Sequence, residues 1–357
     1  MPYEGNLVVD AVSHVYHLGP SNLVGERGRD FVESTYHHTH LYQTEDYYMS
    51  EGQFFKEHDP EEVARVLFLE SDVDFTIHHS LPIVDFFHDG MAGSQKGLDL
   101  RNNDPDRVAI YESINPLSDG AIDDVRRAAN EYDADGLKLY PARYRNGEDL
   151  RVALNESTTR PILDEAVDQG INTVAVHKAL PIGPTSTSYY KLDDVDDVAD
   201  QYPELNFEIV HAGLAFLEET VYLMAKHPNV YANFEITGSL LMTQPRKFGR
   251  VLGEMLLWAG PDRILFASGC VLTHPQPIIE KFWDYQFPEE LRSGYGYPEL
   301  TDEIKRKILG ENAIQMLGRD PAEIRSAVEN DRWAERRASL DERPDAWSSI
   351  SPTGERP

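Results

Sequence analysis

Eight short, mostly apolar segments recur along the chain, and helix-like stretches separate most of them. The apolar segments cover residues 7–13, 74–79, 107–114, 136–140, 172–177, 206–211, 229–235 and 263–268. The stretches with the spacing of amphipathic helices cover residues 60–71, 121–132, 159–169, 193–201, 213–226 and 247–259. Strands buried on both faces read as continuous apolar runs, and repeated strand–helix alternation is typical of a parallel sheet. The sequence therefore predicts an α/β fold, a (β/α)8 TIM barrel.

The domain organisation follows from this pattern. The chain has 357 residues, of which 41% are apolar, and we expect a single barrel domain over residues 1–333. An insertion at about residues 15–59 follows the first strand, where long loops commonly form a lid or a subunit contact. Residues 301–318 have the pattern of a helix pair that closes the barrel. Residues 334–357 are polar and contain prolines, so we expect a loosely ordered C-terminal tail.

Composition narrows the possible partners. The chain has 62 Asp and Glu against 33 Lys and Arg, a formal net charge of −29. Such a surface repels phosphate backbones and anionic lipids, so we expect a small-molecule substrate and no nucleic acid or membrane partner. The same charge density is typical of halophilic proteins, with an ordinary acidic enzyme as the alternative. The single cysteine, Cys270, forbids an intrachain disulfide, and the N-terminus has no signal-peptide pattern, so we expect a cytoplasmic protein.

Histidines end several of the predicted strands. His177 and His211 end the fifth and sixth segments, and His14 follows the first. The carboxyl ends of barrel strands meet at the catalytic mouth, where imidazoles commonly bind a metal ion. Asp10 and His14 lie four residues apart, so a regular strand would direct both to one face. We therefore expect His14, His177, His211 and Asp10 to be metal ligands.

Two other groups are candidates for proton transfer. Lys138 lies in the fourth segment, and Glu235 ends the seventh. A buried lysine needs an acidic partner or loses its proton, so Lys138 is either catalytic or paired with Asp10 or Glu235. We predict His211, Lys138 and Glu235 as the catalytic residues.

The remaining histidines and the cysteine carry weaker signals. His37, His38 and His40 cluster in the insertion, and we interpret them as part of a polar, aromatic lid turn rather than as a metal site. His274 is interpreted as a loop residue. Cys270 has no basic neighbour in the sequence, so we do not expect it to be a nucleophile.

Several motifs occur in the order found in one enzyme family. They are DAVSH at 10–14, GLKLYP at 136–141, His177, VHAG at 210–213, DRILFAS at 262–268 and KILGENA at 307–313. With these motifs the chain resembles the amidohydrolase superfamily, specifically the amidohydrolase-related branch that includes aminocarboxymuconate semialdehyde decarboxylase-like enzymes. The resemblance implies a barrel with one divalent metal ion, usually zinc, bound by Asp-x-His-x-His on strand one, a His on strand five and an Asp ending strand eight. It matches His14 and His177 to ligands and His211 to the strand-six acid/base.

Two positions depart from that ligand set. Val12 stands where the first ligand histidine is expected, and Gly269 stands where an aspartate should follow Ser268. Catalytic zinc typically keeps three protein ligands, which His14 and His177 alone do not supply. Three outcomes stay open: a site rebuilt with His211, Glu235, Asp10 or a strand-two histidine; a metal-free partner of an intact relative; or metal-free chemistry by His and Lys. Three imidazoles would suit zinc or iron, and a carboxylate would favour iron or manganese.

The functional prediction is a metal-assisted hydrolase or non-oxidative decarboxylase of a small carboxylated or amide-bearing molecule. The expected cofactor is a divalent metal, zinc first, then iron or manganese. The alternative is a non-catalytic or accessory subunit, without metal, that pairs with an intact amidohydrolase-like relative, as the resemblance to a superfamily with two-component metal oxygenases implies. We expect a homodimer or a hetero-oligomer with a related barrel subunit, with the aromatic insertion as the candidate interface.

Overall fold

Eight parallel strands form the centre of the computed structural model, which describes residues 5–357. The strands, in their order in the sheet, are β1 (Val9–Ser13), β2 (Phe75–His79), β3 (Val108–Ser113), β4 (Gly136–Leu139), β7 (Thr173–Val176), β8 (Asn206–Ile209), β9 (Val230–Asn233) and β10 (Ile264–Leu265). The segment after β10 returns to β1: the Ala11 amide donates to the Phe266 carbonyl at 3.0 Å, and the His14 amide donates to the Cys270 carbonyl at 2.7 Å. The sheet is therefore a nearly closed barrel, and the predicted fold is confirmed.

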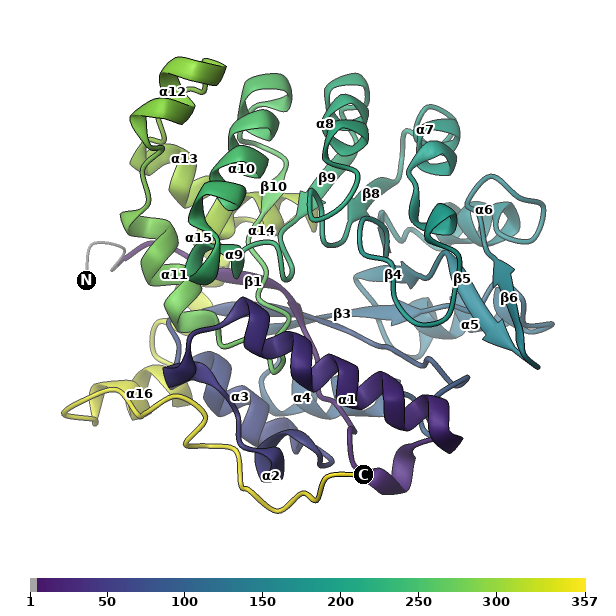
Figure 1. The fold of residues 1–357 in the computed structure, drawn as a ribbon, viewed down its shortest axis with the longest axis horizontal. Helices are drawn as coiled ribbons and strands as arrows, with labels where there is room; N and C mark the ends of the chain where they lie inside the picture. The colour runs from purple at the N-terminus through teal and green to yellow at the C-terminus, as the bar shows by residue number, and fades with distance from the viewer. Residues whose placement is uncertain (1–4) are drawn as a thin grey trace.

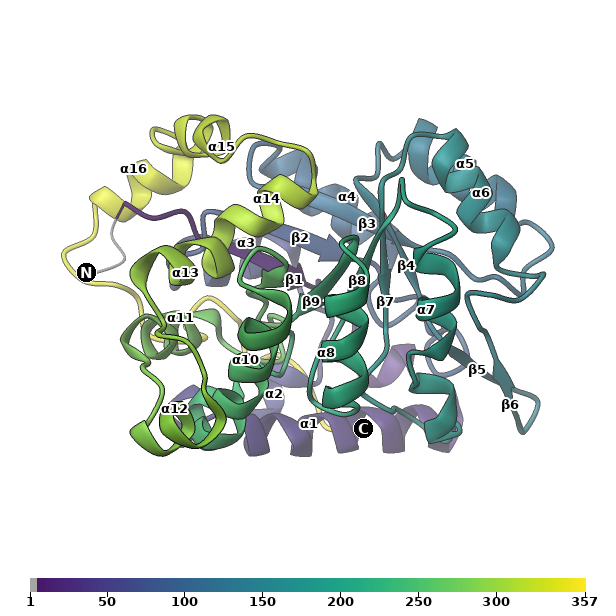
Figure 2. The ribbon, with the colours of Figure 1, turned by 90° about the horizontal axis from the view of Figure 1, so that it is seen from above.

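Helices surround this barrel (Figure 2). The helices between strands are α3 (Pro60–Phe68), α4 (Ser94–Asn103), α5 (Ala121–Asn130), α6 (Arg160–Asp168), α7 (Asp193–Ala199), α8 (Leu217–Lys226), α9 (Leu240–Thr243) and α10 (Pro245–Ala259). Helix α3 illustrates how sequence sets a boundary: Asp59 caps its first turn, Pro60 occupies the first helical position, and Glu62 completes a capping box. Its inner face buries Val63 and Leu67, which covers the outside of the barrel.

The closure after β10 is helical, as expected. Helices α11 (Pro275–Asp284), α12 (Glu289–Tyr295), α13 (Asp302–Arg306) and α14 (Asn312–Met316) follow in order, with the π-helical segment η4 (Lys307–Glu311) between the last two. At the seam between β1 and β10, the Phe266 amide donates to the Ile308 carbonyl at 2.9 Å. A Cβ atom at Gly310 would lie 2.3 Å from the Leu7 carbonyl oxygen, so only glycine lets η4 pack this closely on β1.

The insertion after β1 is built around one long helix. It contains η1 (Pro20–Asn22), α1 (Gly25–Tyr42), η2 (Glu45–Tyr47) and α2 (Glu51–Phe54). The polar, aromatic turn predicted for the clustered histidines is wrong, because these residues lie within α1. Polar residues occupy most of α1, which buries only Gly28, Val32 and Thr39, so it lacks the apolar stripe that usually reveals a helix in a sequence.

Both ends of α1 are fixed to loops at the carboxyl ends of strands. At its start the Val24 amide donates to the Phe86 carbonyl at 2.9 Å. At its end the Thr243 hydroxyl donates to the Leu41 carbonyl at 3.1 Å, and the Gln43 side chain donates to the Leu272 carbonyl at 3.1 Å. Figure 2 shows α1 along one end of the molecule, with α15 (Pro321–Val328) and α16 (Arg332–Ala338) at the other. Helix α1 thus spans the end of the barrel at which the carboxyl ends of the strands lie.

A two-stranded hairpin after β4 was not anticipated from the sequence. It pairs β5 (Ala142–Arg145) with β6 (Glu148–Arg151) in antiparallel register. The Tyr144 ring stacks on Phe86 at a centroid distance of 6.1 Å, and Arg143 pairs with Asp85 at 2.8 Å. The hairpin therefore supports the loop after β2, which forms one wall of the mouth.

The C-terminal segment is packed rather than loose. Residues from 339 onward form an extended strap, shown in yellow in Figure 1, that runs past α3 and α2. Trp347 is only 2% exposed, and its indole donates to the Tyr47 carbonyl at 2.8 Å. The expectation of a loosely ordered tail is wrong, because one tryptophan and one isoleucine, Ile350, anchor an otherwise polar stretch.

No helix within residues 5–357 combines the length and the apolar character that crossing a membrane would need.

Candidate active site at the barrel mouth

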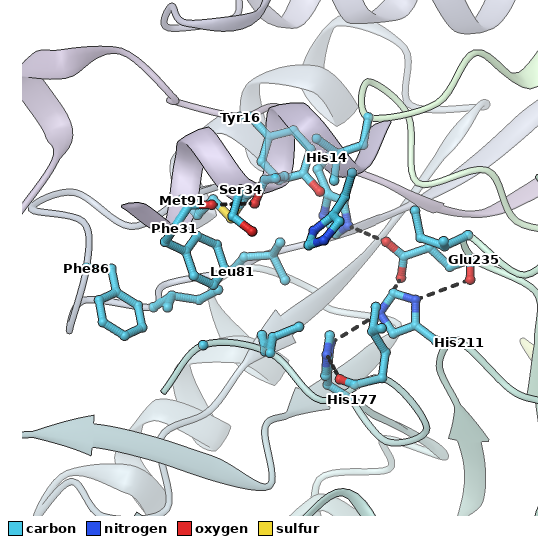
Figure 3. A pocket seen from close by; sticks show the side chains of 18 of the residues that line it. His14, Tyr16, Phe31, Ser34, Leu81, Phe86, Met91, His177, His211 and Glu235 are labelled. Atoms are coloured by element: carbon cyan, nitrogen blue, oxygen red, sulfur yellow. Dashed lines mark hydrogen bonds and ion pairs between the residues drawn. The ribbon is translucent and has the colours of Figure 1, made fainter. Parts of the chain in front are cut away.

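Three histidines and one glutamate lie in a row at the carboxyl ends of four strands (Figure 3). Nε2 of His14 lies 3.4 Å from Oε1 of Glu235, and the other carboxylate oxygen lies 3.6 Å from Nε2 of His211. Nε2 of His211 in turn lies 3.3 Å from Nδ1 of His177. All four side chains are at most 5% exposed. The structure thus brings together four residues from separate strand ends that the sequence had placed at one mouth.

Backbone carbonyls fix the orientation of each imidazole. Nδ1 of His14 lies 2.8 Å from the His79 carbonyl oxygen, and Nδ1 of His211 lies 3.2 Å from the Glu235 carbonyl oxygen. Nε2 of His177 lies 3.0 Å from the Leu180 carbonyl oxygen. A carbonyl can only accept, so these outer nitrogens carry the protons. The inner nitrogens of His14 and His211 face the Glu235 carboxylate, and those of His211 and His177 face each other.

The backbone at the row is held in an uncommon conformation. His211 has φ of 62° and Ile236, the residue after Glu235, has φ of 60°, both in the left-handed region. Non-glycine residues in that region cost of order 1–3 kcal/mol and concentrate at functional sites. The backbone is therefore strained at His211 and at Ile236, the two positions that direct the His211 and Glu235 side chains inward.

The electrostatics of Glu235 and its neighbours are linked, because a positive charge on His211, His14 or Lys138 favours the ionised carboxylate. Burial alone would raise the pKa of Glu235, but His211, His14 and Lys138 together hold it well below its usual range. Burial lowers the pKa of His211 to about 4. Burial also lowers the pKa of Lys138 to about 8, and its Nζ lies 3.3 Å from Nδ1 of His79. Lys138 can therefore change charge near neutral pH.

Asp10 does not join the row. Its carboxylate accepts hydrogen bonds from the Ser268 amide at 2.8 Å, the Val12 amide at 3.2 Å and the Ser268 hydroxyl. The pairing of β1 with β2 shifts register between Asp10 and Ser13, so the regular alternation assumed from the sequence does not hold. Asp10 ties β1 to the segment after β10, and the His79 carbonyl, rather than Asp10, orients His14.

Gly269 explains why the segment after β10 carries no carboxylate. Its φ is 73°, and a Cβ atom there would lie 2.9 Å from Oε1 and 3.0 Å from Cγ of Glu235. The Glu235 carboxylate, which comes from the end of β9, thus fills the space over Gly269. Val12 is fully buried within the barrel and contributes only apolar packing.

The other candidates lie outside the row. His78 accepts a hydrogen bond from the Val15 amide at 3.2 Å, so this strand-two histidine faces the backbone. His274 caps α11 and lies 3.3 Å from a Glu70 oxygen. Burial raises the pKa of the Cys270 thiol well above its usual value, which agrees with a non-nucleophilic role.

A cavity of about 730 Å³ opens above the row. Its floor contains the row and Lys138, and its walls come from α1, the loop after β2 and the loop after β7. Figure 3 shows Phe31, Leu81 and Phe86 together on the side away from Glu235 and His211. Sequence reasoning missed these wall residues, because Phe31 lies on a mostly polar helix and Leu81 and Phe86 lie in a loop, so no apolar periodicity marks them. It also missed Tyr16 and Tyr140, which line the cavity beside His14 and His177.

The donors suit a divalent cation in their chemistry and in the spacing of consecutive atoms along the row. Two ligands at about 2.1 Å from a tetrahedral ion lie roughly 3.4 Å apart, which matches the spacing of consecutive atoms along the row. A backbone carbonyl on the outer nitrogen is the usual support for a metal-binding imidazole. Within residues 5–357, however, no group of three or more His, Cys, Asp or Glu side chains is already arranged around one metal position. A cation would require small side-chain shifts that bring the row around a common centre.

Comparison with known proteins agrees with this architecture. The amidohydrolase family profile matches residues 98–319, well over half of the chain. The chain belongs to the amidohydrolase family. The expectation of an amidohydrolase-related hydrolase or lyase is thereby confirmed at the level of the family. No curated protein matches the sequence.

Solved structures resemble this amidohydrolase-family chain in fold. An uncharacterised TIM-barrel protein from Bordetella bronchiseptica is 15% identical with a TM-score of 0.61, and the match covers 87% of this chain and 99% of that one. The 5-carboxyvanillate decarboxylase of Sphingomonas paucimobilis is 13% identical with a TM-score of 0.53, over 88% and 99% of the two chains. A probable 2-pyrone-4,6-dicarboxylic acid hydrolase from Acinetobacter baumannii is 12% identical with a TM-score of 0.52, over 87% and 99%. The structure of a 5-carboxyvanillate decarboxylase from Novosphingobium aromaticivorans contains manganese.

Proposed function

We propose that this chain is a metal-assisted hydrolase or non-oxidative decarboxylase of a small carboxylated or amide-bearing molecule. The proposal rests on the row itself. Three imidazoles, each held by a backbone carbonyl on its outer nitrogen, line up with one carboxylate. Facing lone pairs repel unless a proton or a metal cation lies between them. The decarboxylase and hydrolase neighbours, and the manganese in one of them, support the choice of reaction and cofactor.

His14, His177, His211 and Glu235 would hold the cation. Three imidazoles and a carboxylate suit zinc, iron or manganese. Such an ion, when bound, would polarise a substrate oxygen or lower the pKa of a water molecule. Because His211 lies between Glu235 and His177, this arrangement makes it a ligand and leaves proton transfer to another group.

Lys138 is the group that would move the proton. Burial lowers its pKa to about 8, so both of its protonation states are accessible near neutral pH. It lines the cavity floor next to the row. The protonated amine would donate to the atom that gains negative charge, which is a carbon in decarboxylation and the leaving nitrogen in amide hydrolysis. Glu235 remains ionised and compensates the charge of Lys138.

The direct test is elemental analysis of protein purified without added metal, combined with thermal denaturation before and after chelation. We expect close to one equivalent of a transition metal and a lower melting temperature after chelation, because an ion that binds only the folded state stabilises it. Fully folded protein with less than roughly a tenth of an equivalent, and no stabilisation by zinc, iron or manganese, would contradict the proposal.

The accessory-subunit alternative stays a separate hypothesis. It predicts a stable complex with an intact barrel relative in the native host and no turnover by the isolated chain. Purification from the native host with size measurement by light scattering separates the two, since a self-assembled, metal-loaded and active protein contradicts the accessory role.

A further inference from the structure

Two tyrosines flank the row at its two ends. The Tyr16 ring packs against His14 at a centroid distance of 4.8 Å. The Tyr140 ring stacks on His177, also at 4.8 Å, with 19° between the ring planes. Both side chains line the cavity floor, although they come from different parts of the barrel, one after β1 and one after β4. The cavity above the row is therefore bordered by one phenol on each side.

Neither hydroxyl group is used by the protein. Within residues 5–357 no hydrogen bond to the hydroxyl of Tyr16 or Tyr140 is formed, although Tyr16 is only 1% exposed. The neighbouring Tyr190 shows the contrast, because its hydroxyl lies 2.7 Å from Oγ1 of Thr185 and donates to the Ile182 carbonyl at 3.0 Å. Tyr16 and Tyr140 both line the cavity, so their hydroxyl groups are available to a molecule bound there. Two unpaired phenols facing one cavity point to a ligand with acceptor atoms.

The chemistry of the surroundings sets what such a ligand can be. A phenol ordinarily keeps its proton at neutral pH, so both hydroxyl groups can donate a hydrogen bond. Phe31, Leu81 and Phe86 form the apolar side of the same cavity (Figure 3). The Phe31 and Phe86 rings stack at 5.5 Å, which joins α1 to the loop after β2. A matching ligand carries acceptor oxygens at one end and an apolar body at the other.

We infer that Tyr16 and Tyr140 are substrate-binding residues that donate hydrogen bonds to the carboxylate or carbonyl oxygens of an aryl or similarly apolar substrate. The apolar body lies against Phe31, Leu81 and Phe86, and the oxygen-bearing head group lies over the row. This inference rests on the site of the proposed function, but it assigns the head-group contacts to two phenols of this chain and does not depend on which metal ion is present.

The test is calorimetric titration with benzoate and benzamide as probes, using the full-length wild type and three single variants. Tyr16→Phe and Tyr140→Phe remove only the hydroxyl group. We expect each to weaken benzoate binding by about tenfold and benzamide binding by about threefold, because a hydrogen bond to a charged group contributes more than one to a neutral group. Tyr190→Phe is the matched control, since its hydroxyl already has partners, and it should bind both probes within about twofold of wild type.

Every outcome bears on the inference. Binding that is equal in wild type, Tyr16→Phe and Tyr140→Phe overturns it, and so does the absence of binding of both probes to the wild type. Circular dichroism and thermal melting of the two variants exclude unfolding as the cause of weak binding. Each titration is run on chelated protein and on protein reloaded with zinc or manganese. If the metal ion leaves probe binding unchanged but the Tyr→Phe variants still bind more weakly, only the proposed function is contradicted. If the metal ion strengthens probe binding but the Tyr→Phe variants bind like the wild type, only this inference is contradicted.

Discussion

Two buried glutamates beside histidines, Glu235 and Glu70, have opposite surroundings. Glu70 accepts hydrogen bonds from the Trp347 amide at 2.7 Å, the Ser349 amide at 2.6 Å and the Ser348 hydroxyl at 3.0 Å, and His274 lies 3.3 Å away. Within residues 5–357, the Glu235 carboxylate contacts two imidazole nitrogens, at 3.4 Å and 3.6 Å, and no backbone amide or hydroxyl donor. A satisfied buried carboxylate holds a structure together, whereas an unsatisfied one is available for a ligand.

The two carboxylates also connect different parts of the chain. Glu70 follows α3 and fastens the C-terminal strap, so its partners lie more than two hundred residues away. Glu235 ends a barrel strand and faces residues from two other strand ends. The comparison teaches that burial and a neighbouring histidine do not by themselves mark a catalytic carboxylate. The two carboxylates differ in whether backbone amides and hydroxyls already donate to them.

The strongest test of the contrast is Glu235→Gln. Removing the negative charge should lower metal content to near zero and any turnover by about a thousandfold, while the free energy of unfolding of the chelated protein changes by only about 1 kcal/mol. Metal analysis, activity assays and urea denaturation measure the three effects. Glu112→Gln is the matched control, because Glu112 is a buried strand-end carboxylate whose partners are Ser80 and Ser94. An unchanged metal content in Glu235→Gln would break the comparison.

Glu70→Gln should lower stability and leave metal content unchanged, the reverse of Glu235→Gln. An amide in place of the carboxylate cannot accept from all four donors, which leaves buried polar groups unpaired and costs about 3 kcal/mol of unfolding free energy. Urea denaturation measures the loss. Metal content per folded molecule should equal that of the wild type. If metal binding were lost and stability kept, the structural role assigned to Glu70 would be wrong.

Gly269→Asp sharpens the comparison by crowding Glu235. The new side chain would collide with the Glu235 carboxylate and add a second negative charge, in a backbone with φ of 73°. We expect a loss of about 2–4 kcal/mol of unfolding free energy. Gly170→Asp is the control, because Gly170 has φ of 78° with nothing within 4 Å of the added Cβ, so it reports the backbone cost alone. Gly269→Asp should lose more unfolding free energy than Gly170→Asp, and the double variant Gly269→Asp/Glu235→Ala should regain that excess. If the double variant regains none of it, the assigned collision with Glu235 is contradicted.

The smallest expected effect is a change with pH in the stability difference between the wild type and Glu70→Gln. Burial would raise the pKa of Glu70, but hydrogen bonds from His274 and Ser349 lower it overall. A carboxyl group with a lowered folded-state pKa contributes stability above its unfolded-state pKa, and that contribution is lost as pH falls through the folded-state value. The stability difference between wild type and Glu70→Gln should therefore narrow as pH falls below about 4.5. Urea denaturation across this range checks the sign, and a difference that widens in acid would contradict it.

The strand ends show how much of this site could be read in advance. His14, His177, His211 and Glu235 were placed at one mouth because parallel strands in a barrel end at the same face. Asp10 was misplaced, because a register shift within β1 has no signature in a single sequence. The strap was misjudged for a related reason: a polar segment is held by one buried tryptophan and by a glutamate far away in the chain.

By itself, the sequence determined the barrel, the order of its strands and the set of residues at its mouth, since these follow from local periodicity and from the geometry of parallel strands. Only the tertiary structure decided which of those residues face one another. It also placed the Glu235 carboxylate over Gly269 and left the Tyr16 and Tyr140 hydroxyls without a hydrogen-bond partner among residues 5–357. These outcomes depend on side-chain directions and on contacts between distant segments, which no local pattern of residues encodes.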